Sequence, residues 1–541
     1  MIQKKFIRGI AVGLVAFLVA FIISSLKLDR PLEWKSWDLR LRLFSKPSQA
    51  SQDIAIFLID QYSLDVYEKE QGLPWPWPRQ MYSAVIKFLQ AGGAKAIIFD
   101  LILTEGSGYG VEDDRNFAEA MARSANVFLP LFVSQKEEQR EAIPFDLLKR
   151  FSLRREGLQT RALFEATSLT IPIENLIKYA RGTGNVQFAP DSDSIYRRIP
   201  LLFAYKDFVI SSLPLAVSWF VQGGGKVQTI PLDESGQMIL YYHGPQGTYR
   251  TYSIASIINS WALIEEGKPP QILPQEFSGK IILIGGSAAG LLDLRPTPFS
   301  AIYPGVEIQA TAIDNLLQRN FVRLPPKVFS VLLILFFALL TGIGVSLLRS
   351  IFKIVLFFIL CLALPALAAC LAFVSGYWLE FIGPAFGVLL SFIGASLLNY
   401  SLEGRQRRFI KNVFRHYLSP EVIERILRNP SLLELGGEKR EITSFFSDMA
   451  GFTFISEGLS PEDLVNLLNI YLSEMTEIIL SHGGTLDKYE GDAIIAFWNA
   501  PLDQPDHALK ACRVALACQK KLEELRPHLR ERFGHELAMR I

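Results

Sequence analysis

The chain has 541 residues, with 55 Lys and Arg against 54 Asp and Glu, so its formal net charge at pH 7 is +1. This balance excludes a dedicated nucleic-acid-binding protein, which would carry a clear basic excess. Half of the residues are hydrophobic and only 20% are charged, and there are four cysteines. These values exclude a disordered chain and a disulfide scaffold, and they direct attention to membrane-spanning segments.

Four apolar segments are long enough to cross a bilayer, for which a helix needs about 20 residues. The first is 9–26, which follows three basic residues. A cleaved signal peptide is the alternative, but this apolar stretch is longer than such peptides usually have, and no small-residue cleavage site follows it. The other three segments are 328–348, 354–375 and 379–399. We predict four transmembrane helices.

Lys and Arg in short flanks mark the cytoplasmic side of a membrane. They gather before the first segment, in the break between the second and third, and after the fourth. Four crossings place all three flanks on one side. We therefore predict a multi-pass protein of the inner membrane, with 1–8 and 400–541 in the cytoplasm and 27–327 outside.

The outer segment, 27–327, is predicted to be an α/β domain. Apolar runs of strand length lie at 54–60, 94–103, 126–133 and 280–285, and a helical pattern lies at 79–91. Continuous apolar strands joined by helices predict a parallel sheet that is covered on both faces.

Two carboxylates follow strands of this domain. Asp60 and Asp100 either cap turns or helices or contact a ligand at the sheet edge. The loop 74–79 carries Trp75 and Trp77, which either fill the core or form a platform for a ligand. The residues alone do not separate these alternatives.

The outer domain resembles the CHASE-two sensor domain of bacterial signalling proteins. The resemblance rests on WKSWDLRLRLF, LID at 58–60, PWPR at 76–79, GGAKAIIFDLIL at 92–103, GKIILIGGSAAGLLDLRPTP at 279–298 and PGVEIQATAIDNLL at 304–317. It implies a receptor that responds to an unknown extracytoplasmic signal. The family's usual layout also has three spanning helices after the sensor.

A helical linker is predicted over 400–439. Ser419 and Pro420 are typical of a helix start, and Val422, Ile426 and Leu427 follow on one face. That face contacts either a second copy of the chain or its own domain.

The last segment, 440–541, carries the chemistry. Asp448 and Asp492 each stand at a strand end beside a glycine-containing turn. Mg²⁺ prefers oxygen ligands from one or two carboxylates together with substrate phosphates. The backbone amides of the turn into the next helix can hold a triphosphate, and these belong to Met449, Ala450, Gly451, Phe452 and Thr453. The alternative is that both aspartates are ordinary turn residues.

FFSDMAGFTFISE at 445–457 and GGTLDKYEGDAIIAFWNAP at 483–501 resemble the class III nucleotidyl cyclases. The resemblance implies an α+β, ferredoxin-like domain in which Asp448 and Asp492 bind two Mg²⁺ or Mn²⁺ ions per site. It also implies attack of the ribose 3′-hydroxyl of ATP on the α-phosphate, which gives 3′,5′-cyclic AMP and diphosphate. Lys488 stands where adenylate cyclases have the lysine that reads adenine, whereas guanylate cyclases usually have glutamate there.

The family shares each active site between two catalytic domains, so the resemblance implies a homodimer formed through the cyclase domain and the linker. The segment 440–541 is shorter than the family's catalytic domain, and the transition-state Asn and Arg and the second base-reading residue cannot be assigned. We therefore expect the chain to be a truncated record of a longer protein.

In chain order, we predict a cytoplasmic N-terminus, an anchor helix, a sensor, three further helices, a linker and the first part of a cyclase domain (1–8, 9–26, 27–327, 328–348, 354–375, 379–399, 400–439 and 440–541). The leading hypothesis is a membrane-bound receptor adenylate cyclase that binds ATP. A guanylate cyclase and a non-catalytic receptor that signals through protein partners are the alternatives.

Overall fold

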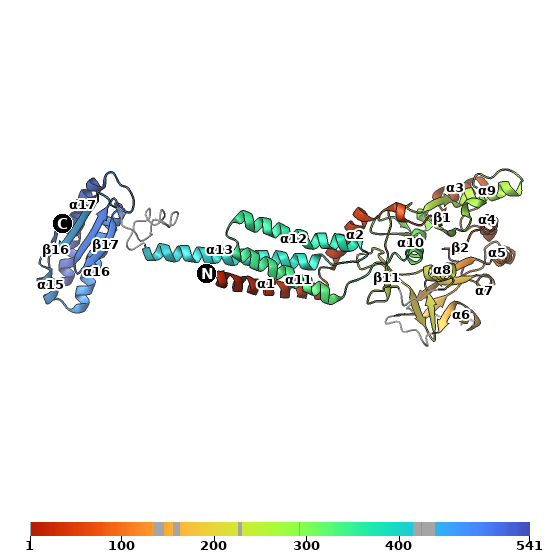
Figure 1. Cartoon of the computed structure of the whole chain (residues 1–541), viewed down its shortest axis with the longest axis horizontal. Helices are drawn as coiled ribbons and strands as arrows, with labels where there is room; N and C mark the ends of the chain where they lie inside the picture. The colour runs from red at the N-terminus through yellow and green to blue at the C-terminus, as the bar shows by residue number, and fades with distance from the viewer. Residues whose placement is uncertain are drawn as a thin grey trace. The chain divides into compact units, whose positions relative to one another are not determined.

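The computed structural model describes residues 2–134, 145–154, 163–224, 230–291, 293–414, 424 and 439–541 (Figure 1). The chain divides into two compact units, Met1–Ala395 and Ser396–Ile541. Each unit is described by itself below. The linker residues Ser419, Pro420, Val422, Ile426 and Leu427 lie outside the described residues.

Four helices of the described residues are long and apolar enough to cross a membrane, as the sequence predicts. They are α1 (Ile2–Ser25), α11 (Lys327–Leu347), α12 (Ile351–Val374) and the part of α13 (Ile382–Phe414) that ends at Ser401. The fourth helix begins three residues later than expected. The reason is that Trp378 is buried and donates its indole N–H to Glu33 Oε1 at 3.1 Å, which holds the preceding chain outside the helix.

Small residues allow α1 and α11 to pack closely. A Cβ atom added to Gly9 would lie 2.6 Å from Cα of Ile343, and one added to Gly13 would lie 2.8 Å from Cα of Leu339. Glycine at these positions lets the two backbones approach, which is a common way for helices to associate in membranes.

The first unit is built on a sheet of seven strands. The order is β12 (Arg250–Ser253), β1 (Ile54–Ile59), β13 (Ile281–Gly286), β2 (Ala96–Phe99) and β3 (Val127–Ser134), all parallel. β3 then pairs with β7 (Gly182–Asn185) in parallel and with β6 (Ser168–Thr170) in antiparallel fashion. The predicted parallel sheet is confirmed, and β6 is its one antiparallel addition among the described strands.

Helices cover both faces of this sheet, as predicted. Alternate side chains of β1 enter two different clusters: Phe57 packs with α4 (Arg79–Gly92), α5 (Val111–Ser124) and α9 (Ile254–Glu265), whereas Ile56 packs with α8 (Leu213–Gln222) and α10 (Gly305–Gln318). Because strand side chains alternate between faces, a strand that is buried on both sides must be apolar throughout.

Smaller elements complete the first unit. They are the helices α2 (Arg30–Phe44), α3 (Gln61–Gln71), α6 (Phe145–Phe151) and α7 (Glu174–Ile177), the sheet of β4 (Ser152–Arg154), β10 (Phe208–Ser211), β9 (Leu202–Tyr205) and β5 (Phe164–Glu165), and the pairs β11 (Gln237–Ile239) with β8 (Arg198–Pro200) and β14 (Leu294–Arg295) with β15 (Tyr303–Pro304).

The second unit has the element order β16 (Thr443–Met449), α15 (Phe452–Gly458), α16 (Pro461–Ser481), β17 (Thr485–Glu490), β18 (Ala493–Trp498), α17 (His507–Phe533) and β19 (Met539–Arg540). The four strands form an antiparallel sheet in the order β17-β18-β16-β19. This is the predicted ferredoxin-like arrangement.

The helices of the second unit lie on one face of its sheet. Phe445, Ile494 and Trp498 point into a buried cluster with α16 and α17. Their neighbours Phe446 and Ile495 point to the opposite face, where Phe446 is 61% exposed. The sheet therefore has one covered face and one open face.

Candidate functional site

The turn at the end of β16 and the β17–β18 hairpin bring the two predicted aspartates to one edge of the sheet. The backbone N–H of Met449, the residue after Asp448, donates to Oδ2 of Asp492 at 2.7 Å. Gly491 and Asp492 form the two-residue hairpin loop, and Gly491 takes φ +65°, which suits the first position of a tight hairpin turn. Two carboxylates from distant parts of the sequence thus flank one strand end.

Asp448 has unused capacity to bind a cation. Its Oδ1 atom is buried and has no hydrogen-bond partner among the described residues. Burial raises the pKa of the nearby Tyr471 to about 12, and the charges of Cys518, Asp492 and Asp448 act in the same direction. A buried acceptor without a donor is costly unless a ligand satisfies it, so the residues fit a hard cation.

Two carboxylates do not complete a metal site alone. Within the described parts of the chain, no group of three or more His, Cys, Asp or Glu side chains could hold an ion. Mg²⁺ is commonly bound by one or two carboxylates plus substrate phosphates and water. The donor set therefore suits an ion that arrives with a phosphorylated substrate.

Only part of the turn after Asp448 is available to a phosphate. The amide of Met449 is used by Asp492, and the amide of Ala450 donates to the carbonyl of Ala538 at 2.8 Å. Gly451, with φ +73°, starts α15. The first amides of a helix lack intrahelical acceptors, so the N–H groups of Phe452 and Thr453 have no acceptor within α15.

A β-bulge decides where Lys488 points. The register of β17 against β18 shifts between Leu486, which pairs with Ala496, and Lys488, which pairs with Ile495. Leu486 and Ala496 face the helices, so without the extra residue Lys488 would face them too. The bulge at Asp487 turns Lys488 to the open face, beside Ile495, whose other neighbour across the sheet is Phe446. Bulges often re-aim side chains next to active sites, and sequence reasoning missed this one because a single unpaired residue leaves no periodic signal.

Comparison with known families identifies both units. The sequence model of the CHASE2 domain matches residues 14–343, more than half of the chain. The chain belongs to the CHASE2 domain family. A second model, described as the Adenylate and Guanylate cyclase catalytic domain, matches residues 437–541. The chain therefore joins a CHASE2 sensor domain to a nucleotidyl cyclase domain, which confirms both resemblances found in the sequence.

Relatives match the cyclase domain. "Adenylate cyclase 1" of Rhizobium meliloti (strain 1021) is 35% identical over 129 residues, 22% of this chain and 19% of that protein. "Adenylate cyclase" of Anabaena cylindrica is 38% identical over 93 residues, 17% of each chain. The chain thus spans about a fifth of the length of these curated relatives.

Solved cyclase structures are also similar to this chain. The guanylyl cyclase Cya2 is 42% identical, with 19% of this chain and 53% of that chain covered and a TM-score of 0.19. The adenylyl cyclase CyaB from P. aeruginosa is 40% identical, with 18% and 52% covered and a TM-score of 0.18.

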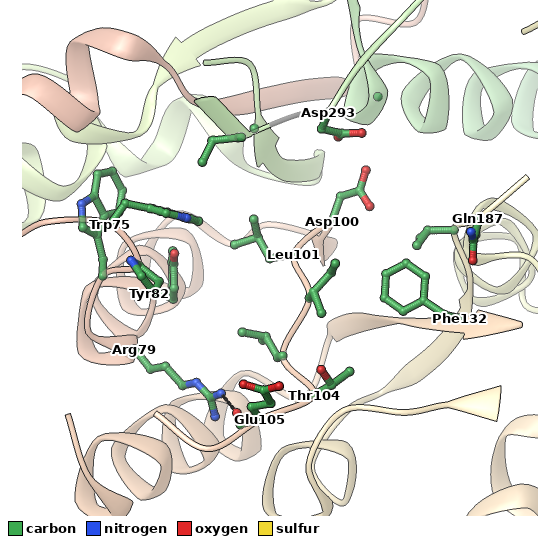
Figure 2. A pocket seen from close by; sticks show the side chains of 18 of the residues that line it. Trp75, Arg79, Tyr82, Asp100, Leu101, Thr104, Glu105, Phe132, Gln187 and Asp293 are labelled. Carbon is green, nitrogen blue, oxygen red and sulfur yellow. Dashed lines mark hydrogen bonds between the residues drawn. The ribbon is translucent and has the colours of Figure 1, made fainter. Parts of the chain in front are cut away.

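The two strand-end carboxylates of the CHASE2 domain have different roles. Oδ1 of Asp60 caps α3 by accepting the amide of Ser63 at 2.9 Å. Asp100 instead lines a cavity at the carboxyl end of β2, together with Trp75 and Trp77 (Figure 2). Trp77 is also part of the core, which is the first of the two roles that the sequence left open.

The hydrogen bond between Met449 and Asp492 yields a stability prediction. Asp492→Ala should lower the local free energy of opening of β16 by about 1.5–3 kcal/mol, the usual worth of a hydrogen bond to a charged group. Asp448→Asn should not lower it in metal-free buffer, because Asp448 Oδ1 has no partner to lose. Hydrogen–deuterium exchange of peptides that cover β16 measures both. Equal exchange in the two variants would contradict the role given to Asp492.

Proposed function

We propose that this protein is a membrane-bound receptor adenylate cyclase that converts ATP to 3′,5′-cyclic AMP and diphosphate under the control of its CHASE2 domain. The observation that carries the proposal is the geometry at the end of β16. There the N–H of Met449, the residue after Asp448, donates to Asp492, and the buried Oδ1 atom of Asp448 has no hydrogen-bond partner among the described residues. The adenylate cyclases among the relatives support the choice of reaction.

Asp448 and Asp492 would hold two Mg²⁺ or Mn²⁺ ions per site. When bound, such a pair activates the ribose 3′-hydroxyl and neutralises charge on the leaving diphosphate. The 3′-oxygen forms a bond to the α-phosphorus as the bond to diphosphate breaks. The turn Met449, Ala450, Gly451, Phe452 and Thr453 would bind the phosphates, chiefly through the N–H groups of Phe452 and Thr453, because those of Met449 and Ala450 are already used.

Lys488 would read the base. Its ammonium group can only donate hydrogen bonds, so it suits the N1 acceptor of adenine and not the N1–H and N2 donors of guanine. The bulge at Asp487 places it on the open face of the sheet. Guanylate cyclase activity is the alternative within the enzyme class.

The sheet's open face would pair with a second copy of the chain. Phe446 is 61% exposed there, although an apolar ring of this size is normally buried. A homodimer that covers this face would place two equivalent sites between its cyclase domains. The helical linker would contribute to the same dimer.

The proposed location is the inner membrane. The four apolar helices would cross it, and the Lys and Arg residues of their flanks support an outside CHASE2 domain and a cytoplasmic cyclase domain. ATP is then on the same side as Asp448 and Asp492. Lipid, ATP, a second copy of the chain and an extracytoplasmic signal are the proposed partners.

The reaction is tested by measuring cyclic AMP made by the full-length protein in Mg²⁺ or Mn²⁺. Asp448→Ala and Asp492→Ala should each reduce the rate about 100-fold or more, because each removes a metal ligand worth several kcal/mol to the transition state. Glu462→Ala, which changes an exposed carboxylate on α16, is the control and should keep the wild-type rate. Full activity in both aspartate variants would refute the metal assignment.

The base assignment is tested with Lys488→Glu. This change should lower kcat/KM for ATP about tenfold or more, since it replaces a donor to adenine by an acceptor of the opposite charge. Rates with ATP and GTP are measured for both proteins. Unchanged ATP kinetics and an unchanged product would show that Lys488 does not contact the base.

The dimer is tested by placing a charge on either side of the sheet. Phe446→Arg should reduce both cross-linked dimer and cyclase activity about tenfold or more, because an unpaired charge would be buried in the interface. Leu516→Arg changes an apolar side chain of α17 that is 73% exposed on the helix side, and it should leave both quantities unchanged. Equal effects of the two changes would argue against an interface on the open face.

A further inference from the structure

The CHASE2 domain contains a cavity of about 1060 Å³ beyond the carboxyl ends of β2 and β13 (Figure 2). Ligands of open α/β sheets bind at this edge, and sites for small molecules usually measure about 300–1,000 Å³. The cavity is thus in the expected place and large enough for an organic metabolite. One end of the cavity is lined by carboxylates, whereas its walls are mainly aromatic and apolar.

Two carboxylates share one end of the cavity with a single compensating cation. Figure 2 shows the side chains of Asp100 and Asp293 directed toward the same space. Oδ1 of Asp293 lies 3.4 Å from Nε of Arg295. No hydrogen bond or ion pair joins the carboxylate of Asp100 to a described residue. When both carboxylates are ionised, they carry one negative charge more than Arg295 neutralises.

The electrostatics of Asp100 agree with this count. Burial, and after it the charge of Asp293, raises the pKa of Asp100 to about 8, although Arg295 acts in the opposite direction. The carboxyl group is therefore mostly protonated at neutral pH, and a cation placed beside it favours its ionised form.

A third acceptor reaches the cavity from α10. Gln309 is 3% exposed, and its Nε2 donates to the carbonyl of Val186 at 3.1 Å. Because a carbonyl can only accept, this bond fixes the orientation of the amide and leaves Oε1 as the free atom. Oε1 is buried with no partner among the described residues, so a donor on a ligand would satisfy it.

Gly305 brings this acceptor near Asp293. It stands one turn before Gln309 on α10, and residues four apart share a helix face. A Cβ atom at Gly305 would collide with the carboxylate of Asp293, so glycine makes room for that side chain. Asp100, Asp293 and Gln309 therefore all present acceptors to one cavity, and a primary ammonium group has three N–H donors.

Aromatic and apolar side chains form the cavity walls. Trp75 is 38% exposed, and its ring centre lies 5.4 Å from that of Trp77. Tyr82, Leu101 and Phe132 also line the space. Arg79 does not add a competing charge, because its guanidinium pairs with Asp114 outside the cavity. Such walls suit an apolar body and attract a cation to the ring faces.

We propose that this cavity of the CHASE2 domain binds an organic compound that carries a primary ammonium group on an apolar body. Asp100, Asp293 and Gln309 accept the three N–H bonds, and Trp75 and Tyr82 contact the body. A divalent metal ion fits less well, because it needs about six oxygen ligands and the described residues provide no group of three or more carboxylate, His or Cys side chains for one.

Calorimetry of the purified full chain in nanodiscs tests the proposal without any assay of the cyclase. The probes are 2-phenylethylamine, tryptamine and hexylamine, each compared with the alcohol that replaces its amine by a hydroxyl. At least one amine should bind about tenfold or more tightly than its alcohol, since only the amine offers a positive charge to the carboxylates of Asp100 and Asp293. Binding of no amine, or equal binding of amines and alcohols, would overturn the proposal.

Variants locate the site. Asp100→Asn and Gln309→Leu should each weaken amine binding about tenfold, whereas Asp65→Asn, which changes a half-exposed carboxylate of α3 outside the cavity, should not. Gln309→Leu changes neither the charge nor much of the side-chain volume. It therefore tests the site if the Asp100→Asn variant does not fold. Wild-type affinity for the amine in both cavity variants would overturn the assignment. Binding of Mg²⁺ or Ca²⁺ to the protein without any amine, in competition with the amine, would overturn it as well.

Discussion

The guanidinium group of Arg197 holds α2, the helix that follows α1, to the rest of the CHASE2 domain. Its side chain is fully buried, and it binds Asp38 of α2 through two bonds of 2.7 Å and also Asp191 and Asp193. A buried charge is tolerated only when it is paired and hydrogen-bonded. The position of α2 therefore depends on this cluster.

The same helix also holds the start of the helix that leads toward the cyclase domain. Glu33 of α2 pairs with Arg40 at 2.6 Å, and its Oε2 accepts the amides of Phe381 and Ile382 at 2.8 and 3.0 Å. These amides stand at the beginning of α13, where a carboxylate is favourable. Through α2, the segment 191–197 and the start of α13 are joined by charged hydrogen bonds and not by apolar contact alone.

In both proposed sites, one polar group is fixed by a hydrogen bond to the backbone, and a nearby buried acceptor has no hydrogen-bond partner among the described residues. Asp492 is held by Met449 while Asp448 Oδ1 is free, and Gln309 is held by Val186 while its Oε1 is free. A buried acceptor without a partner carries an energetic cost, which a bound ligand would remove at each of the two proposed sites. In both sites the fixing hydrogen bond involves a backbone group, N–H of Met449 or C=O of Val186, which keeps the site in place before a ligand binds.

The sequence by itself determined the four apolar helices, the covered parallel sheet and the strand-end aspartates, because hydrophobic period and turn residues are local properties of the chain. It missed the edge strand β12, since Arg250–Ser253 is half exposed and has no apolar run. The roles of Asp60 and Asp100, the link between Met449 and Asp492, and the direction of Lys488 were decided only by tertiary structure. Each depends on strand register or on a partner far away in sequence, and a single-residue bulge reverses the face of a side chain without changing the composition around it.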